Sequence, residues 1–225
     1  MYMRLTREQF DALLRDNQLV LSLIGMSNIG KSYWSKKLSE IGFDHFSCDD
    51  AIESRLAPVL QELGYHGIED VSRWMGQPYD DRFSVNQGQY LSYEQEALEY
   101  FFISRQHGTL RNTILDTTGS VVHTGEPMRE KLKKHSLVIY IEATESMKEE
   151  MFRRYIAEPK PVVFGDFFIP KEGETVFQTL GRSYRALLNE RESLYTQCAD
   201  VRISCRQIQD NMNVHELLSL IRQSL

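Results

Sequence analysis

The feature that most constrains this chain is a glycine-rich segment between a predicted strand and a predicted helix. Residues 18–24 (QLVLSLI) are nearly all apolar, as is typical of a strand buried on both faces of a parallel sheet. The next segment, GMSNIGKS, fits the pattern G-x-x-x-x-G-K-[S/T], and residues 31–41 continue with a helical spacing of apolar side chains. In this order of strand, loop and helix, backbone N–H groups and the helix start wrap around a phosphate group.

Within this loop, Lys31 is expected to reach the β- and γ-phosphates of a nucleotide, and Ser32 to bind Mg²⁺. The alternative is a glycine-rich turn that binds no nucleotide, but the strand and helix on either side favour the phosphate-binding interpretation. The nucleotide-binding residues expected in this segment are Gly25, Met26, Ser27, Asn28, Ile29, Gly30, Lys31, Ser32 and Tyr33.

Beyond the loop, short apolar runs alternate with helical patterns. This alternation indicates an α/β fold with a parallel sheet. Strands are expected at 18–24, 44–47, 113–116, 137–142 and 200–204, and helices at 31–41, 50–63, 92–106, 146–156 and 176–197.

Two segments interrupt the alternation. Residues 64–93 are rich in Gly, Gln, Asp and Tyr with a short helical patch at 71–75, which predicts an insertion above the sheet. Its aromatic side chains either line a pocket or pack the segment. Residues 157–173 contain three prolines and two glycines, so we expect a flap rather than a continuous helix. Residues 1–17 are expected to form an added helix with Thr6 as N-cap, ahead of a main domain at 18–225.

Composition excludes several classes of protein. With 225 residues, 41% hydrophobic and 26% charged, the chain is long enough for one domain with its own core. No apolar run approaches the ~20 residues of a membrane span, and the first residues lack the apolar centre of a signal peptide, so we expect no membrane contact and a cytoplasmic location. The net charge of −6 offers no basic surface for nucleic acid. The three cysteines and six histidines lack metal-binding spacing.

Acidic residues follow the second and third predicted strands. Asp49 and Asp50 come directly after residues 44–47, where the carboxyl end of a parallel strand lies beside the first loop. One of them is expected to orient or deprotonate an acceptor hydroxyl; the alternative is that either serves as a helix N-cap. Asp116 ends the third strand, where a Walker-B-type aspartate holds Mg²⁺; the alternative there is a capping role.

Taken in order, these segments resemble the shikimate kinase family of phosphate-loop kinases, which is related in fold to the nucleoside monophosphate kinases. The resemblance covers about residues 18–225, with a poor match at 64–93. It rests on GMSNIGKS, FSCDDAIESR, TTGSVV, VIYIEATESMKEEMFRR, the pair Lys160-Pro161, and NERESLY followed by ADV. It implies a three-layer α/β/α fold with a five-stranded parallel sheet, a substrate-binding insertion, a mobile lid at about 157–173, ATP with Mg²⁺, and transfer of the γ-phosphoryl group to a hydroxyl.

The resemblance also implies roles for single residues. Arg191 matches the arginine that holds a substrate carboxylate, Asp49 the acid close to the accepting hydroxyl, and Arg153 the arginine that lies against adenine. Lys160 stands where the lid usually supplies an arginine to the phosphates; a lysine neutralises charge there but offers no bidentate fork. Gly119 keeps one position of a glycine triplet that approaches the substrate.

The chain departs from the family at three places. Leu91 replaces a second substrate-binding arginine, for which Arg82 in the insertion is the best substitute. Thr118-Gly119-Ser120 replaces the glycine triplet and adds side chains near the substrate. A carboxylate clamp with one arginine argues against shikimate itself as the acceptor. Ser47 stands where the family has its first acid after strand two. Two residues are left to supply the missing negative charge, Asp50 and Asp116.

We therefore predict an ATP-dependent phosphotransferase that acts on an alcohol group of a small hydroxylated metabolite, as a monomer or weak homodimer. Two alternatives stay open. One is a nucleotide-binding regulatory or partner-binding protein without transfer activity, and the other is a nucleoside or nucleotide kinase whose acceptor stacks on the aromatic insertion. The expected site comprises Lys31, Asp49 and Lys160 for catalysis; Asp49, Arg82, Gly119 and Arg191 for the substrate; and Ser32 and Asp116 for the metal.

Overall fold

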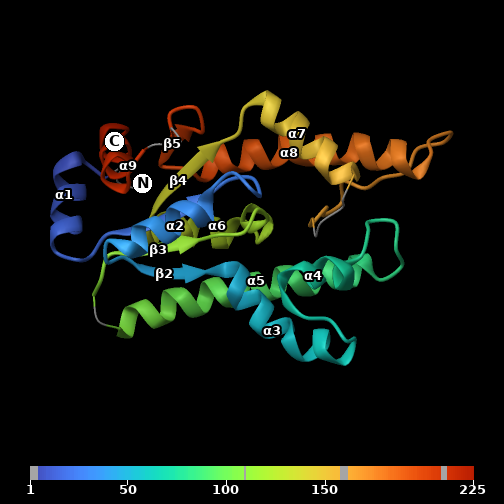
Figure 1. Cartoon of the computed structure of the whole chain (residues 1–225), viewed down its shortest axis with the longest axis horizontal. Helices are drawn as coiled ribbons and strands as arrows, with labels where there is room; N and C mark the ends of the chain where they lie inside the picture. Colours follow the sequence, from blue (N-terminus) through green and yellow to red (C-terminus); the bar gives the residue numbers. More distant parts are fainter. Residues whose placement is uncertain (1–4, 109, 158–161, 209–211) are drawn as a thin grey trace.

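The computed structural model describes residues 5–108, 110–157, 162–208 and 212–225. Its centre is a five-stranded, all-parallel sheet with the strand order β2-β3-β1-β4-β5 (Figure 1). The strands are β1 (Val20–Ile24), β2 (Asp44–Ser47), β3 (Thr113–Asp116), β4 (Leu137–Glu142) and β5 (Val201–Ser204). The predicted α/β class and the five-stranded parallel sheet are confirmed, and each strand lies within the range expected from the sequence.

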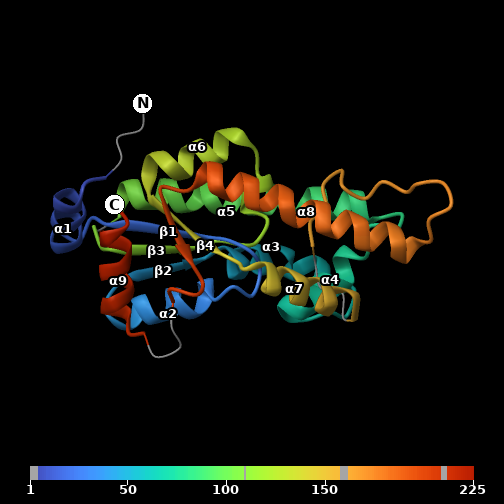
Figure 2. The ribbon, with the colours of Figure 1, turned by 90° about the horizontal axis from the view of Figure 1, so that it is seen from above.

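Helices cover both faces of the sheet, which gives three layers (Figure 2). One face carries α5 (Phe83–His107), α6 (Glu126–His135) and α8 (Val176–Cys198), and the other carries α2 (Lys31–Glu40) and α9 (Val214–Gln223). Beyond the carboxyl ends of the strands lie α3 (Cys48–Glu62), α4 (Gly67–Met75) and α7 (Glu145–Ala157), with α1 (Arg7–Arg15) at the opposite end. The segments that interrupt the alternation therefore gather at the end of the sheet where ligands bind in this class of fold.

The central strand β1 connects the two apolar layers. All of its side chains are buried. Val20 and Ile24 belong to the apolar cluster shared with α3, α5, α6 and α8, whereas Leu21 and Leu23 belong to the cluster shared with α1, α2 and α9. Because both faces of the strand are covered, both sets of alternating positions are mostly apolar. The exception is Ser22, which is fully buried and whose hydroxyl donates to Ser136 Oγ at 2.7 Å.

The segment 64–93 is more helical than the sequence predicts. It contains α4 and the beginning of α5, which starts at Phe83 rather than at residue 92. Trp74, Phe83 and Tyr90 are buried in the core, whereas Tyr79 is 46% exposed. Most of the aromatic side chains therefore pack this segment. Its helical period was hidden because the buried positions stand among Gly, Gln, Ser and Asn, which interrupt the apolar stripe.

Two further helices, α6 and α9, were not predicted. The helix α6 (EPMREKLKKH) buries only Met128 and Leu132, so its apolar stripe is sparse. A capping box precedes α9: the Asn213 side chain accepts from the Glu216 N–H, and the Glu216 side chain accepts from the Asn213 N–H. This N-x-x-E signal is readable in the sequence. Among the described helices, none is long and apolar enough to cross a bilayer.

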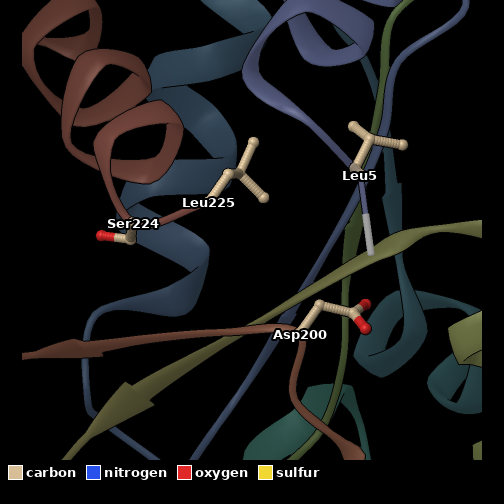
Figure 3. Close-up of a pocket in the computed structure, with 4 residues that line it drawn as sticks. All are labelled: Leu5, Asp200, Ser224 and Leu225. Atoms are coloured by element: carbon tan, nitrogen blue, oxygen red, sulfur yellow. The ribbon is translucent and has the colours of Figure 1, made fainter. Parts of the chain in front are cut away.

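The first helix docks on the last helix of the same chain. Thr6 is the N-cap of α1, as predicted. Phe10 is 1% exposed, and the Asp11 carboxylate accepts two hydrogen bonds from Arg222, at 2.6 Å from Nε and 2.7 Å from Nη2. Beside this contact, one small pocket is lined by Leu5, Asp200, Ser224 and Leu225 (Figure 3). The two ends of the described chain therefore belong to one packed region.

We expect Phe10→Ala to lower the free energy of unfolding by about 3–5 kcal/mol, because it removes a buried aromatic side chain and leaves a cavity. Phe177→Ala is the matched control, since Phe177 is 69% exposed and an exposed substitution changes stability by about 0.5 kcal/mol or less. Urea unfolding followed by circular dichroism measures both. Equal effects of the two substitutions would show that α1 adds nothing to the core.

Candidate active site

The phosphate loop leaves β1 through a glycine that no other residue can replace. Gly25 has φ +146°, and a Cβ atom there would lie 2.8 Å from the carbonyl oxygen of Ile141 in β4. Gly30, with φ +102°, is the N-cap of α2. Both conformations favour glycine because the side chain of any other residue would be strained there. The loop is therefore bent closely over the end of the sheet.

Lys31 begins α2 and is held under this loop. Its side chain is buried, and Nζ donates hydrogen bonds to the carbonyl oxygens of Gly25 and Met26, each at 3.0 Å. Burial lowers the pKa of Lys31, while the charges of Asp116 and Asp49 oppose this shift. The ammonium group thus lies across the loop among acidic residues from two other segments.

The acids after β2 and β3 are placed by strand pairing. Ser47 and Asp116 are direct register partners at the ends of the two parallel strands. The Ser47 hydroxyl accepts from the Asp50 N–H at 3.1 Å and caps α3. The alternative that Asp49 or Asp50 is the N-cap is therefore wrong, because both residues already lie inside the helix. Asp50 is exposed.

Asp116 is the buried acid of this group. It is 4% exposed, and its Oδ2 lies 3.6 Å from Nε2 of His45. Its Oδ1 is one of the buried side-chain oxygens that have no hydrogen-bond partner among the described residues. A buried carboxylate oxygen without a partner is costly unless a ligand or ion completes it. Ser32, the second predicted metal ligand, is exposed on the first turn of α2.

Asp49 lies on the first turn of α3, half-buried. Burial raises its pKa, the charge of Lys31 lowers it, and the charge of Asp116 raises it. The hydroxyl group of the buried Tyr90 on α5 also acts to lower this pKa. Asp49 therefore lies within electrostatic reach of both the lysine and the second acid.

Glu94 is a site residue that the sequence prediction missed. It lies on α5, is fully buried, and accepts hydrogen bonds from the hydroxyl groups of Thr118 and of Ser120, the latter at 2.7 Å. The pKa of Glu94 is raised to about 7. Burial is the main cause and the charge of Asp49 is a further one, while these hydrogen bonds act to lower it. The sequence signal that could have found Glu94 was its place in the segment YLSYE, three residues after Leu91, which stands at the position of a substrate-binding arginine in the resemblance.

Gly119 joins the loop to the far side of the site. A Cβ atom there would lie 2.5 Å from Ser27 Oγ and 3.6 Å from Arg191 Nη1. Tyr195, one helical turn after Arg191 on α8, donates from its hydroxyl to the Gly119 carbonyl at 2.5 Å. Gly119 is therefore enclosed by the phosphate loop on one side and by α8 on the other.

Arg191 is buried at 4% exposure and has two hydrogen-bond partners, one in the short helix Val121–His123 that follows β3 and one in the segment after residue 161. Its Nε donates to Nε2 of His123 at 3.2 Å, and its Nη2 donates to the Val163 carbonyl at 2.8 Å. Burial, together with the charges of Arg191 and Arg129, lowers the pKa of His123 to about 4. His123 is therefore neutral near pH 7 and is able to accept this hydrogen bond.

The remaining predicted residues lie further out. Arg82 is the exposed N-cap of α5; at 1.5 Å per residue, it lies about 18 Å along the helix from Glu94. Arg153 is exposed on α7, where its Nη2 lies 3.2 Å from Glu150 Oε2. Tyr33 is 52% exposed. Lys160 lies outside the described residues.

No protein-family model and no curated protein matches this sequence. Solved structures match it over most of its length. A shikimate kinase from Bacteroides thetaiotaomicron aligns with a TM-score of 0.56 at 14% identity, covering 91% of this chain and 97% of that one. A shikimate kinase from Acinetobacter baumannii, in complex with shikimate, aligns with a TM-score of 0.55 at 21% identity, covering 95% of each chain. A third, from Aquifex aeolicus, aligns at 0.53 and 14%, covering 92% and 95%.

The alignments and the sheet order define the class of fold, which is that of the phosphate-loop kinases. Within this class, the chain has the fold of the shikimate kinases over nearly its whole length. The resemblance drawn from the sequence is confirmed at this level. At 14–21% identity, the alignments carry the fold and not the substrate.

Glu94 predicts a specific dependence of stability on pH. Its pKa is raised from 4.5 to about 7 on folding, so the folded protein retains a proton that the unfolded chain releases. Stability contributed by this group is therefore lost as pH rises through this window. Between about pH 4 and about pH 8, we expect the free energy of unfolding of Glu94→Gln to rise by on the order of 3 kcal/mol relative to that of the wild type.

Urea unfolding across this pH range measures the difference. Glu96→Gln is the matched control, since Glu96 is exposed on the same helix and pairs with Arg55 at 3.3 Å. Parallel pH profiles for the wild type and Glu94→Gln would mean that Glu94 titrates as an ordinary surface acid.

Proposed function

We propose that this protein is an ATP- and Mg²⁺-dependent kinase that transfers the γ-phosphoryl group to a hydroxyl of a small metabolite other than shikimate. The observation that carries the proposal is the convergence of Lys31, Asp49, Asp116 and Arg191. The charges of the other three all act on the pKa of Lys31, although the four residues come from separate segments. Phosphoryl transfer depends mainly on positioning and charge neutralisation, and this set of residues is suited to both.

On this proposal, the nucleotide phosphates are held by Lys31 and by the amides of residues 25–33. Ser32 and Asp116 hold the metal: the partnerless Oδ1 of Asp116 is an oxygen of the kind that Mg²⁺ prefers. When bound, Mg²⁺ would neutralise the negative charge that develops on the phosphates during transfer. Arg153 lies against the adenine ring, and Lys160 neutralises phosphate charge from the lid.

Asp49 is proposed to orient the acceptor hydroxyl and accept its proton. The charge of Lys31 lowers the pKa of Asp49 and so favours the ionised form, which is able to accept a proton. Arg191 and Gly119 contact the acceptor on the opposite side, and Arg82 is the proposed replacement for the second arginine. Leu91, which is half-buried against the apolar cluster, provides no charge at the position of that arginine.

A thermal-shift screen tests the kinase proposal. We expect ATP·Mg²⁺ to raise the melting temperature, and one acceptor from a panel of sugar acids, polyols, hydroxy-amino acids, nucleosides and shikimate to raise it further, because ligands that bind the folded state stabilise it. Acceptor-dependent release of ADP then establishes transfer. Lys31→Ala is expected to lose the nucleotide shift.

The outcomes separate the alternatives. A nucleotide shift with no acceptor and no ADP release would favour a regulatory nucleotide-binding protein. A nucleoside as the only effective acceptor would favour a nucleoside kinase. No nucleotide shift at all would overturn the phosphate-loop assignment.

The register of β2 and β3 allows a direct test of the metal site. Because Ser47 and Asp116 are cross-strand partners, an acid at either position lies at the same level of the sheet. We expect Asp116→Ser to raise, by about tenfold, the Mg²⁺ concentration at the midpoint of the ATP-dependent shift in melting temperature. This corresponds to about 1.4 kcal/mol of binding free energy. The double variant Ser47→Asp/Asp116→Ser is expected to recover most of it, since aspartate also preserves the N-cap.

Titration of MgCl₂ at fixed ATP, followed by melting temperature, measures the midpoint. Asp50→Ser is the control, because Asp50 is exposed and its backbone N–H, not its side chain, bonds Ser47. An equal loss in Asp50→Ser would move the metal role to that residue. A double variant no better than Asp116→Ser alone would show that the two strand ends are not interchangeable.

A further inference from the structure

The part of the lid that follows residue 161 is packed into the protein around one phenylalanine. Phe164 is fully buried. Its ring centroid lies 6.2 Å from Phe83 on α5, 5.9 Å from Tyr155 on α7 and 6.2 Å from Tyr184 on α8. Tyr155 in turn stacks on Tyr184 at 4.4 Å. The lid segment therefore fills the space between three helices with aromatic side chains.

A single glutamine binds the backbone of this segment. Gln87 lies one helical turn after Phe83 on α5. Its Oε1 accepts from the N–H groups of Phe164 and Gly165, each at 3.1 Å, and its Nε2 donates to the Gly165 carbonyl at 3.3 Å. Three hydrogen bonds from one side chain to two consecutive residues restrict both position and direction of the backbone.

A second set of contacts joins the same two regions. The Tyr155 hydroxyl donates to Gln77 Oε1 at 3.1 Å, and the rings of Tyr79 and Phe168 lie 6.3 Å apart. Gln77 and Tyr79 come from the connection between α4 and α5. The connection between α4 and α5 is therefore joined both to α7 and to the segment after residue 161.

The glutamine is linked to the candidate substrate site through one peptide. Val163 directly precedes Phe164, and its carbonyl accepts from Arg191 Nη2 at 2.8 Å. The segment that Gln87 holds thus also sets one hydrogen bond of the arginine that is proposed to bind the acceptor. Val163 and Arg191 are both buried, at 2% and 4% exposure, so this bond is shielded from water.

We propose that Gln87 is a positioning residue for acceptor binding. From its place on α5, Gln87 holds residues 163–165 as a fixed outer wall of the site. Through the Val163 carbonyl, it also orients Arg191. This inference rests on the proposed function for its statement about the acceptor. Buried aromatic rings back this wall, so it favours compact hydroxylated acceptors over larger ones such as nucleosides.

The structural part is tested without any activity, by amide hydrogen exchange in the full chain. In Gln87→Leu, the amides of Phe164 and Gly165 lose their acceptor, and we expect their exchange to accelerate about tenfold or more. Gln87→Glu keeps an acceptor for both amides and is expected to retain most of the protection. Gln89→Leu is the matched control, because Gln89 lies on the same helix and donates instead to Tyr93 at 2.9 Å.

Unchanged exchange at Phe164 and Gly165 in Gln87→Leu would overturn the proposal, whether or not the protein is a kinase. With an acceptor from the screen, Gln87→Leu is expected to raise the acceptor KM about tenfold while the KM for ATP and kcat stay within about twofold. For Gln87→Glu, we expect an acceptor KM close to that of the wild type. An acceptor KM that does not change despite faster exchange would overturn the positioning role, and absence of transfer in the wild type would overturn only the proposed function.

Discussion

Parallel pairing of β1 with both β3 and β4 is the constraint on which the rest of the site depends. It places the ends of neighbouring strands at one edge of the sheet, so that the loop after β1 must turn over the end of β4. Gly25 is where this turn occurs, with room for hydrogen but not for a Cβ atom against the Ile141 carbonyl. Once the loop follows this path, Lys31 is directed back across it, onto the carbonyl oxygens of Gly25 and Met26.

The charged residues at this edge are held with little access to water. Lys31, Asp116, Glu94 and Arg191 are all buried, and burial is the first cause of the pKa shifts of Lys31 and Glu94. Burying charges costs free energy unless each is paired or hydrogen-bonded. A fold that keeps four such groups together is therefore using stability to maintain a charged site, and perturbed titrations of this kind are concentrated at functional sites.

The strands and the phosphate loop were predictable from the sequence because local pattern determines them: a run buried on both faces, then glycines where the backbone must turn. The partnerships within the site were not. Nothing in the local sequence links Gln87 to Gly165, or Ser47 to Asp116, since the first pair depends on helix–lid packing and the second on strand register. The same holds for the early start of α5. It depends on the packing of Phe83 against aromatic rings from distant segments.

Glu94 links two of the places where the sequence departs from the resemblance, Leu91 and the segment 118–120. Leu91 and Glu94 are three residues apart on α5, so they lie on neighbouring positions of one helix face. Leu91 carries no charge, so it gives the buried acid at position 94 no cation on this face. The hydroxyl groups of Thr118 and Ser120 supply hydrogen bonds to that acid instead, which is the condition under which it remains buried. Gly119 between them stays glycine because a side chain there would meet the phosphate loop. The hydroxyl side chains on either side of Gly119 therefore bind a buried carboxyl group whose pKa is raised to about 7 by burial.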